Sequence, residues 1–422
     1  MNEKIALLRK YNLWDSNVSD LGYRRSEYSD KIAGYVGNRL IKVLVGQRRS
    51  GKSYILRQIA KQLVDNGAKP ENTLYINREL AEFDFLKTYK DLDELVKSYR
   101  KELKPVGKVY IFIDEVQMID GWETIVNSYS QDFVESYEIF ISGSNSKMLS
   151  GELATLLSGR YVKFEIFPFS YSEYLGITQK ESGRQSYTEY MNSGGLPELF
   201  MLQKQELKRN YVSALKDTVL LRNIIQRYNI RDPQLLEDIF VFLVNNASNF
   251  TSIANIVKYF KGLGRRTSYD AVSAYIGYIE DTFLVHRCNR YDIKGKDTLS
   301  GNAKFYINDL AYKNYLYPGY GYGVGYMVDN LIYLELCRAG FDVYVGSLRN
   351  KEVDFVAIKG DRVLYVQCAY ILVDRQTIDR EYSSLEAIDD SFEKIVVSLD
   401  EITLPSKGGI KHIQAWRLSE LL

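Results

Sequence analysis

The stretch Val45–Leu56, "VGQRRSGKSYIL", decides how the first part of the chain folds. The apolar run before it, "LIKVLV" (Leu40–Val45), is typical of a buried parallel strand. After Lys52, apolar residues recur at helical spacing as far as Gly67, which is a favourable helix stop. The sequence therefore predicts a strand, a glycine-rich loop and a helix in direct succession.

The loop has the spacing G-x-x-x-x-G-K-S, which suits the binding of phosphate groups. Its two glycines let backbone N–H groups face inward, and the helix N-terminus adds positive partial charge. The lysine can reach the β- and γ-phosphates of ATP, and the last serine can bind Mg²⁺. We therefore expect ATP and Mg²⁺ as cofactors, bound by Gly46, Gln47, Arg48, Arg49, Ser50, Gly51, Lys52, Ser53 and Tyr54.

An acidic pair ends a second buried run, "KVYIFIDEVQMI" (Lys108–Ile119). Acids at the carboxyl end of a parallel strand lie where open α/β sheets bind their ligands. We expect Asp114 to hold Mg²⁺ and Glu115 to act as the base that polarises the attacking water. The alternative is an acidic pair that only favours the start of a helix.

Small polar residues follow a third run, "YEIFISGSNSKML" (Tyr137–Leu149). Ser142 or Ser144 is expected to contact the γ-phosphate or the water, and Asn145 is a further candidate. A capped turn between strand and helix is the alternative interpretation.

Arg160 stands before another predicted strand. An arginine there can stabilise a γ-phosphate, in cis or from a neighbouring subunit, which would require a homo-oligomer. The alternative is an ordinary surface arginine.

The motifs "VGQRRSGKS", "FIDEVQ", "ISGSNSKMLSGELATLLSGRY", "FPFSYSEYL" and "NSGGLPELF" together resemble a prokaryotic family of AAA-type P-loop ATPases. Its members join an ATPase domain of the AAA+ superfamily to a C-terminal domain of unknown function. The resemblance covers nearly the whole chain and is strongest between Leu40 and Phe200. It implies that Pro197, in a Gly-Gly-Leu-Pro turn, contacts the adenine. A turn that only starts a helix is the alternative.

The segment Thr251–Asp292 shows a helix, a glycine-containing turn, a second helix and a strand, which is winged-helix spacing. Arg265 and Arg266 precede the second helix, where such domains contact DNA phosphates. The acids Asp270 and Glu280 make this helix far from basic, so a protein partner stays open as well as DNA.

The last part alternates helices and strands in an order that resembles the PD-(D/E)xK nuclease core. Asp329 lies on the predicted helix, and Asp354 matches the acid on a strand. Gln367 stands where that family has a metal-binding glutamate, and Ala369 stands where it has a lysine. Glutamine is a poor ligand for divalent metals and alanine cannot help to activate water. We therefore expect a nuclease-like fold, with Asp329, Asp354 and Gln367 as its remnant, but no nuclease activity.

The chain's 422 residues exceed the size of one ordinary core. We expect an α/β protein with a P-loop AAA+-type parallel sheet, then a helical lid, a winged-helix segment and a restriction-endonuclease-like domain. The corresponding residues are 1–170 for the ATPase core, 171–232 for the lid, 233–292 for the winged helix and 293–422 for the degenerate nuclease-like domain.

The charges nearly balance, with 55 basic and 54 acidic residues, so any DNA-binding face must be local. Three separated cysteines and two histidines form no zinc pattern and fit a reducing compartment, so we expect a cytoplasmic protein. No apolar run approaches the about 18 residues of a membrane span, and the N-terminus lacks a signal-peptide pattern.

Together these features predict an ATP-binding, Mg²⁺-dependent ATPase whose nucleotide state controls the winged-helix and nuclease-like module. Two alternatives remain: a slowly hydrolysing nucleotide switch that regulates binding to a protein partner, and a DNA-processing enzyme under ATP control.

Overall fold

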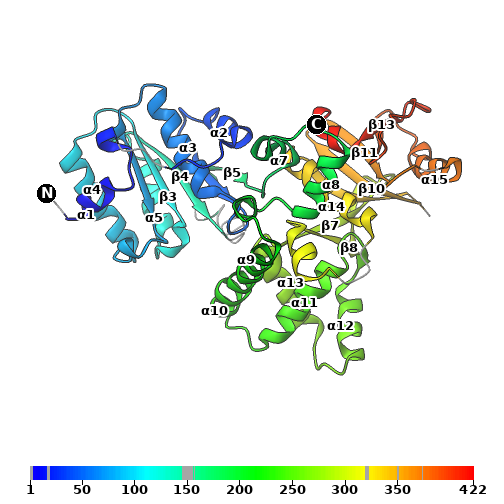
Figure 1. The fold of residues 1–422 in the computed structure, drawn as a ribbon. Helices are drawn as coiled ribbons and strands as arrows, with labels where there is room; N and C mark the ends of the chain where they lie inside the picture. The colour runs from blue at the N-terminus through cyan, green and yellow to red at the C-terminus, as the bar shows by residue number, and fades with distance from the viewer. Residues whose placement is uncertain are drawn as a thin grey trace. The chain divides into compact units, whose positions relative to one another are not determined.

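A five-stranded parallel sheet forms the centre of the first of two units, Met1–Ile166 (Figure 1). Its strand order is β2-β3-β4-β1-β5, and every neighbouring pair is parallel. The carboxyl ends of all five strands therefore lie at one edge of the sheet. The bounds are β1 Ile41–Val45, β2 Thr73–Asn77, β3 Val109–Asp114, β4 Tyr137–Gly143 and β5 Tyr161–Glu165.

The computed structural model describes residues 3–16, 20–144, 155, 157–318, 323–348, 351–372 and 374–422. The first unit contains the helices α1 Glu3–Arg9, α2 Ser26–Ala33, α3 Lys52–Asp65, α4 Tyr89–Leu103 and α5 Trp122–Ser130. Short 3₁₀ turns are η1 Trp14–Ser16, η2 Pro70–Asn72, η3 Ala81–Phe83 and η4 Val116–Met118.

Strands β1 to β4 of this sheet are almost entirely buried because helices cover it on both sides, whereas the edge strand β5 is mostly half-buried (Figure 1). On one face, Phe112 and Phe140 stack with ring centroids 4.6 Å apart and belong to the same core cluster as Ile55 and Ile59 of α3. Helix α2 packs beside α3, and α4 packs against α5. The strand, loop and helix predicted around Val45–Leu56 are thus confirmed as β1, the connecting loop and α3.

The second unit, Phe167–Leu422, is built on an eight-stranded mixed sheet of order β13-β12-β11-β10-β9-β7-β8-β6. The pairs β7–β9, β11–β12 and β12–β13 are parallel and the others are antiparallel. Its strands are β6 Phe250–Thr251, β7 Val285–Asp292, β8 Asp297–Ile307, β9 Asp342–Leu348, β10 Lys351–Lys359, β11 Arg362–Cys368, β12 Glu393–Ser398 and β13 Lys411–Gln414.

Helix α14 anchors the core of this second unit. Tyr333 on α14 stacks on Tyr306 of β8 with ring centroids 4.2 Å apart, and the Asn330 amide bonds both backbone groups of Ile307. The unit's helices are α7 Tyr171–Thr178, α8 Arg184–Ser193, α9 Gln205–Asp217, α10 Gln226–Tyr228, α11 Pro233–Asn245, α12 Ile253–Gly262, α13 Tyr269–Asp281, α14 Val324–Arg338 and α15 Arg375–Glu386. The 3₁₀ helices are η6 Pro197–Met201 and η9 Ala415–Glu420, and the π-helices are η7 Thr218–Ile225 and η8 Tyr312–Leu316.

The α/β fold with a parallel P-loop sheet is confirmed. The predicted order of helix, turn, helix and strand is present as α12, α13 and β7, and β8 pairs with both β7 and β6. Helix α14 and strands β9 to β11 follow in the order expected for the last part, and α15 and β12 come after them. The winged-helix and nuclease-like assignments, and the division into four segments, stay predictions. Among the helices of the described residues, none has both the length and the apolar character of a membrane span.

Candidate functional site

The loop between β1 and α3 adopts a backbone that requires its two glycines. Gly46 has a φ of 144°, and a Cβ there would lie 2.2 Å from the carbonyl oxygen of Ile166. Gly51 has a φ of 96° and directly precedes the first residue of α3. L-residues rarely adopt such values, so both positions favour glycine. The loop therefore leads the chain tightly from the sheet edge into the N-terminus of α3.

Lys52 turns back over this loop. Its Nζ donates hydrogen bonds to the carbonyl oxygens of Gly46 and Gln47, both at 2.9 Å, and the residue is 4% exposed. Burial lowers the pKa of Lys52, whereas the nearby carboxylates of Glu115 and Asp114 raise it. The cation is thus held at the loop, where a phosphate chain would be bound.

Asp114, at the end of β3, is a fully buried carboxylate surrounded by hydroxyl groups. Tyr75 donates to its Oδ2 at 3.0 Å, and Ser142 donates to its Oδ1. Burial raises the pKa of Asp114, as does Glu115, whereas hydrogen bonds from Ser142, Ser53 and Tyr75 lower it. The Ser53 hydroxyl is thus near enough to Asp114 to lower its pKa, and a hydroxyl near a carboxylate is an oxygen set that fits Mg²⁺.

Glu115 occupies a left-handed backbone conformation, with φ 54° and ψ 49°. For a non-glycine residue this conformation stores strain, and such strain is frequent at functional sites. The side chain is held in place, because Ser144 donates to its Oε2 at 3.1 Å and Gln117 donates to the same oxygen. Glu115 is 8% exposed, so this carboxylate is positioned and nearly dry.

Strand register brings these groups to one edge of the sheet. Val45 lies opposite Gly143 on β4, and Asn77 lies opposite Asp114. Ser142 accepts a hydrogen bond from the backbone N–H of Glu115 at 3.2 Å and donates to Asp114, so it links the two acids. Asn145 lies outside the described residues.

The remaining loop residues differ in burial and in their contacts. Gln47 and Ser50 are fully buried, and the Ser50 hydroxyl has no hydrogen-bond partner within the described residues. A buried hydroxyl without a partner is costly unless a ligand satisfies it, which is consistent with a phosphate site. Arg48 forms an ion pair with Glu79, Arg49 has a φ of 67°, and Tyr54 is 37% exposed.

Arg160 lies at the opposite edge of the sheet from the loop. Its carbonyl accepts a hydrogen bond from the N–H of Ile41, the first residue of β1, at 2.9 Å. The loop begins at the far end of β1, and five residues of strand span roughly 16 Å, which exceeds the reach of an arginine side chain. This distance argues against the cis alternative, and both the cis role and the role at a neighbouring subunit's site stay predictions.

The Gly-Gly-Leu-Pro turn has a structural explanation within the second unit. The carboxylate of Asp309 accepts the N–H of Gly195 at 2.8 Å, and Phe169 donates its N–H to the Gly195 carbonyl at 2.8 Å. A Cβ on Gly194 would lie 2.1 Å from Asp309 Oδ1. These contacts account for the glycines, and Pro197 begins η6, as the alternative interpretation expected. Contact between Pro197 and adenine stays a prediction.

The residues of the nuclease-like remnant occupy the predicted elements. Asp354 lies on β10, where its Oδ2 accepts the N–H of Cys368 at 2.8 Å. Gln367 on β11 donates to Glu381 of α15 at 2.9 Å. Burial raises the pKa of Asp354 to about 6, and burial together with Asp354 raises that of Asp329. Asp354 and Gln367 thus have hydrogen-bond partners in the folded chain, and their role as a nuclease-like remnant stays a prediction.

Lys304 of β8 is a member of this cluster that we did not predict. It forms an ion pair with Glu352 and lies 3.8 Å from Asp354 Oδ1. Within the described residues, no group of three or more His, Cys, Asp or Glu side chains is placed to hold a metal ion. Lys304 lies 50 positions before Asp354, so no local sequence signal could have revealed the pair.

The two arginines predicted to contact DNA differ in their contacts and exposure. Arg265 forms an ion pair with Asp238 of α11, so it supports the packing of that helix. Arg266 is exposed before α13, whose N-cap is Ser268.

Two further residues beside the loop were not predicted from the sequence. Arg25 is buried and donates to the Ser50 carbonyl at 2.6 Å. Tyr75 is buried and donates to Asp114, as described above. Both act across the fold from distant positions in the chain, and neither belongs to a spacing that could have indicated it.

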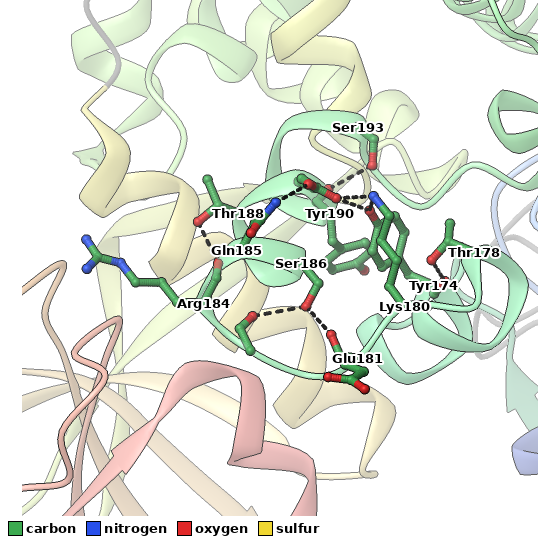
Figure 2. A network of polar contacts seen from close by, with 12 residues as sticks. Tyr174, Thr178, Lys180, Glu181, Arg184, Gln185, Ser186, Thr188, Tyr190 and Ser193 are labelled. Atoms are coloured by element: carbon green, nitrogen blue, oxygen red, sulfur yellow. Dashed lines mark hydrogen bonds and ion pairs between the residues drawn. The ribbon is translucent and has the colours of Figure 1, made fainter.

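A groove of about 700 Å³ in the second unit lies beside the turn between α7 and α8 (Figure 2). In this turn, Ser186 donates to the carbonyls of Glu181 and Gly183, and Lys180 is paired with Glu189. The hydrogen bonds and the ion pair that Figure 2 shows thus stabilise the turn beside the groove.

Comparisons with known proteins show the family to which the chain belongs. A family model for an AAA domain matches residues 38–175, and one for a domain of unknown function (DUF8612) matches residues 184–319. An uncharacterized protein of Haemophilus influenzae is 34% identical over 378 residues, 89% of this chain and 92% of that relative. The chain belongs to this family of AAA-domain P-loop ATPases. The AAA-domain match covers the whole loop, Asp114 at the end of β3 and Glu115 directly after it.

Two other similarities are more distant. An uncharacterized protein of Methanocaldococcus jannaschii is 29% identical over 383 residues, 87% of this chain and 83% of the relative. A solved Walker-type ATPase of Pyrococcus abyssi is similar with a TM-score of 0.44 and 15% identity, over 70% of this chain and 96% of that chain. The predicted membership of an AAA-type family with a C-terminal domain of unknown function is confirmed by the family models and the first relative.

Proposed function

We propose that this AAA-domain protein hydrolyses ATP with Mg²⁺ and uses its nucleotide state to control its C-terminal half. The observation that carries the proposal is Glu115: a strained, nearly dry carboxylate, fixed by Ser144 and Gln117, beside Asp114 at the loop edge of the sheet. The first requirement of a general base is that its carboxylate is held in a fixed place within reach of the water, and the bonds from Ser144 and Gln117 hold the Glu115 carboxylate in a fixed place.

Each group at this edge has a role in the proposal. Lys52 places a positive charge against the β- and γ-phosphates. Asp114 and Ser53 would hold Mg²⁺, which when bound neutralises charge on the phosphate oxygens. Glu115 accepts the proton of the attacking water, and Ser142 keeps both acids in register through its two hydrogen bonds.

Arg160 completes the site only in an oligomer. Because it lies at the opposite edge of its own sheet, we propose that it reaches the γ-phosphate bound by a neighbouring copy. A homo-oligomer would then be the active form, and its turnover would depend on protein concentration.

Contact between Pro197 and adenine is a separate prediction of the resemblance. The contacts of Gly194 and Gly195 with Asp309 hold this turn within the second unit.

Steady-state turnover tests the proposal against its main alternative. A hydrolysing enzyme releases phosphate continuously at saturating ATP. A slowly hydrolysing switch that regulates a protein partner would bind one nucleotide and release phosphate at most once until that partner is added. The experiment therefore pairs a nucleotide titration with phosphate release over many turnovers.

We also propose that α12 and α13 contact DNA. The supporting observation is that these helices expose cationic and tyrosine side chains. Lys258, Lys261 and Arg266 are exposed there, and Tyr259 and Tyr269 are 49% and 56% exposed. Cations contact the phosphates of DNA, and exposed tyrosine hydroxyls can donate hydrogen bonds to phosphate oxygens. Binding to duplex DNA that weakens steeply with salt would support this role. Unchanged binding by a Lys258→Ala/Lys261→Ala/Arg266→Ala variant would contradict it.

We also propose a cytoplasmic location. The three cysteines are all free, which fits a compartment that keeps thiols reduced.

A further inference from the structure

Arg25 is an arginine buried beside the phosphate loop. It directly precedes α2 and is 1% exposed, although a guanidinium is costly to bury without hydrogen-bond partners. Its Nη1 donates to the carbonyl oxygen of Ser50 at 2.6 Å, and its Cζ lies 4.6 Å from the centroid of the Tyr28 ring. The charge is thus directed at the backbone of the loop.

The segment that carries Arg25 is itself tied to α3. The Arg25 N–H donates to Gln58 Oε1 at 3.0 Å, and Gln58 Nε2 donates to the carbonyls of Leu21 and Tyr23 at 2.7 and 2.8 Å. Because Gln58 lies on the helix that begins at Lys52, Arg25 and the loop share one rigid support. The bond from Arg25 to Ser50 therefore fixes the loop relative to its own helix.

This bond determines which way one loop N–H points. In a planar trans peptide the C=O and N–H groups point in opposite directions. The carbonyl of Ser50 points to Arg25, so the N–H of Gly51 in the same peptide points away from Arg25. A Cβ on Gly51 would lie 3.4 Å from Arg25 Nη1, which shows how closely the two approach. In phosphate loops, inward-facing N–H groups of this kind bind the α- and β-phosphates.

We propose that Arg25 is a positioning residue of the nucleotide site. It holds the Ser50–Gly51 peptide in the orientation that presents the Gly51 N–H to the phosphate chain, and it does not contact the nucleotide itself. This inference rests on the proposed ATP-binding function of the loop, and it adds a residue outside the loop motif to the binding of the diphosphate.

The test compares the affinities of ADP and AMP for the full-length protein and its Arg25 variants. Arg25→Met removes the donor and keeps the length, and Arg25→Lys keeps the charge and one donor. We expect Arg25→Met to lower the ratio of ADP to AMP affinity about tenfold, the value of one hydrogen bond, and Arg25→Lys to lower it less. The matched control is Arg24→Met, which removes a neighbouring arginine that is 70% exposed and paired with Asp30.

Unfolding temperatures without nucleotide show which variants are folded. A folded Arg25→Met protein with the wild-type ratio overturns the proposal, and so does an equal loss for ADP and AMP, which would show that the effect does not act on the diphosphate. If Arg25→Met does not fold, Arg25→Lys decides: a lowered ratio supports the positioning role and a wild-type ratio overturns it. If wild-type protein binds neither nucleotide, the proposed function fails first, which is a distinguishable result.

Discussion

The Ser142 hydroxyl donates a hydrogen bond to the carboxylate of Asp114, and the same oxygen accepts the backbone N–H that follows Asp114 in the chain. One side chain on β4 therefore fixes both acids at the end of β3. Ser142→Ala removes this link and leaves a methyl group in a fully buried position. We expect ATP to bind nearly as in the wild type and kcat to fall about 10- to 100-fold, as for other groups that orient metal ligands. Parallel measurements of nucleotide Kd and kcat check this, and an unchanged kcat would contradict the positioning role.

Arg160→Ala tests whether neighbouring copies share a site. If Arg160 reaches the γ-phosphate of ATP bound by a neighbouring copy of the chain, kcat of the variant should fall about 10³-fold. Mixing it with Lys52→Ala protein should restore part of the activity, because the second variant supplies Arg160 to sites that still have Lys52. Arg39→Ala is the matched control, since Arg39 is exposed and precedes β1 at the same edge of the sheet. A mixture no more active than its separate components would argue against sharing.

Asp309 predicts a specific dependence of stability on pH. Burial raises its pKa from 3.8 to about 6, so the folded chain binds the proton more tightly than the unfolded chain. Its contribution to the free energy of unfolding is complete below pH 3.8 and is lost as the pH rises through about 6. Over this window the contribution changes by about 3 kcal/mol at most. Asp309→Asn should therefore reduce the decline in stability between pH 4 and pH 6.

Urea unfolding at intervals of pH measures this difference. The control is Asp297→Asn, an exposed aspartate on β8, which should follow the wild-type curve. Parallel curves for wild type and Asp309→Asn would show that the carboxyl does not titrate in this range.

The C-terminal cluster is expected to leave DNA uncut. Asp354 is engaged by the N–H of Cys368 and lies near Lys304, and Gln367 is bonded to Glu381. A carboxylate with these partners would hold Mg²⁺ weakly, so water there would not be activated. Purified protein should leave linear, circular and single-stranded DNA intact with Mg²⁺ or Mn²⁺, with and without ATP. Cleavage that disappears in Asp354→Ala would make this domain a nuclease.

The loop and the two acids were predictable because their signals are local. A buried run that ends at Gly46 and a helix that begins at Lys52 leave little freedom for the residues between them. Asp114 and Glu115 follow another buried run, so parallel pairing alone brings them to the same edge.

The other features of the site depend on contacts between residues that lie far apart in the sequence. The edge at which Arg160 lies follows from the pairing of β1 with β5. The glycines of "NSGGLPELF" are explained by Asp309, which is 114 residues from Gly195. Arg25 likewise acts through a side chain that crosses to Ser50, 25 residues later. The spacing of a motif indicates only the local backbone geometry. Contacts between residues far apart in the sequence can be identified only from the folded structure.

The central claim, that this chain hydrolyses ATP at the β1–α3 loop with Glu115 as base, is tested most directly by Glu115→Gln. The amide can still orient water but cannot accept its proton, so multiple-turnover phosphate release should fall about 10²-fold or more while ATP affinity stays near the wild-type value. Lys52→Ala, measured beside it, should lose most of the affinity itself, because it removes the charge on the β- and γ-phosphates. Wild-type turnover by Glu115→Gln, or wild-type affinity in Lys52→Ala, would contradict the account.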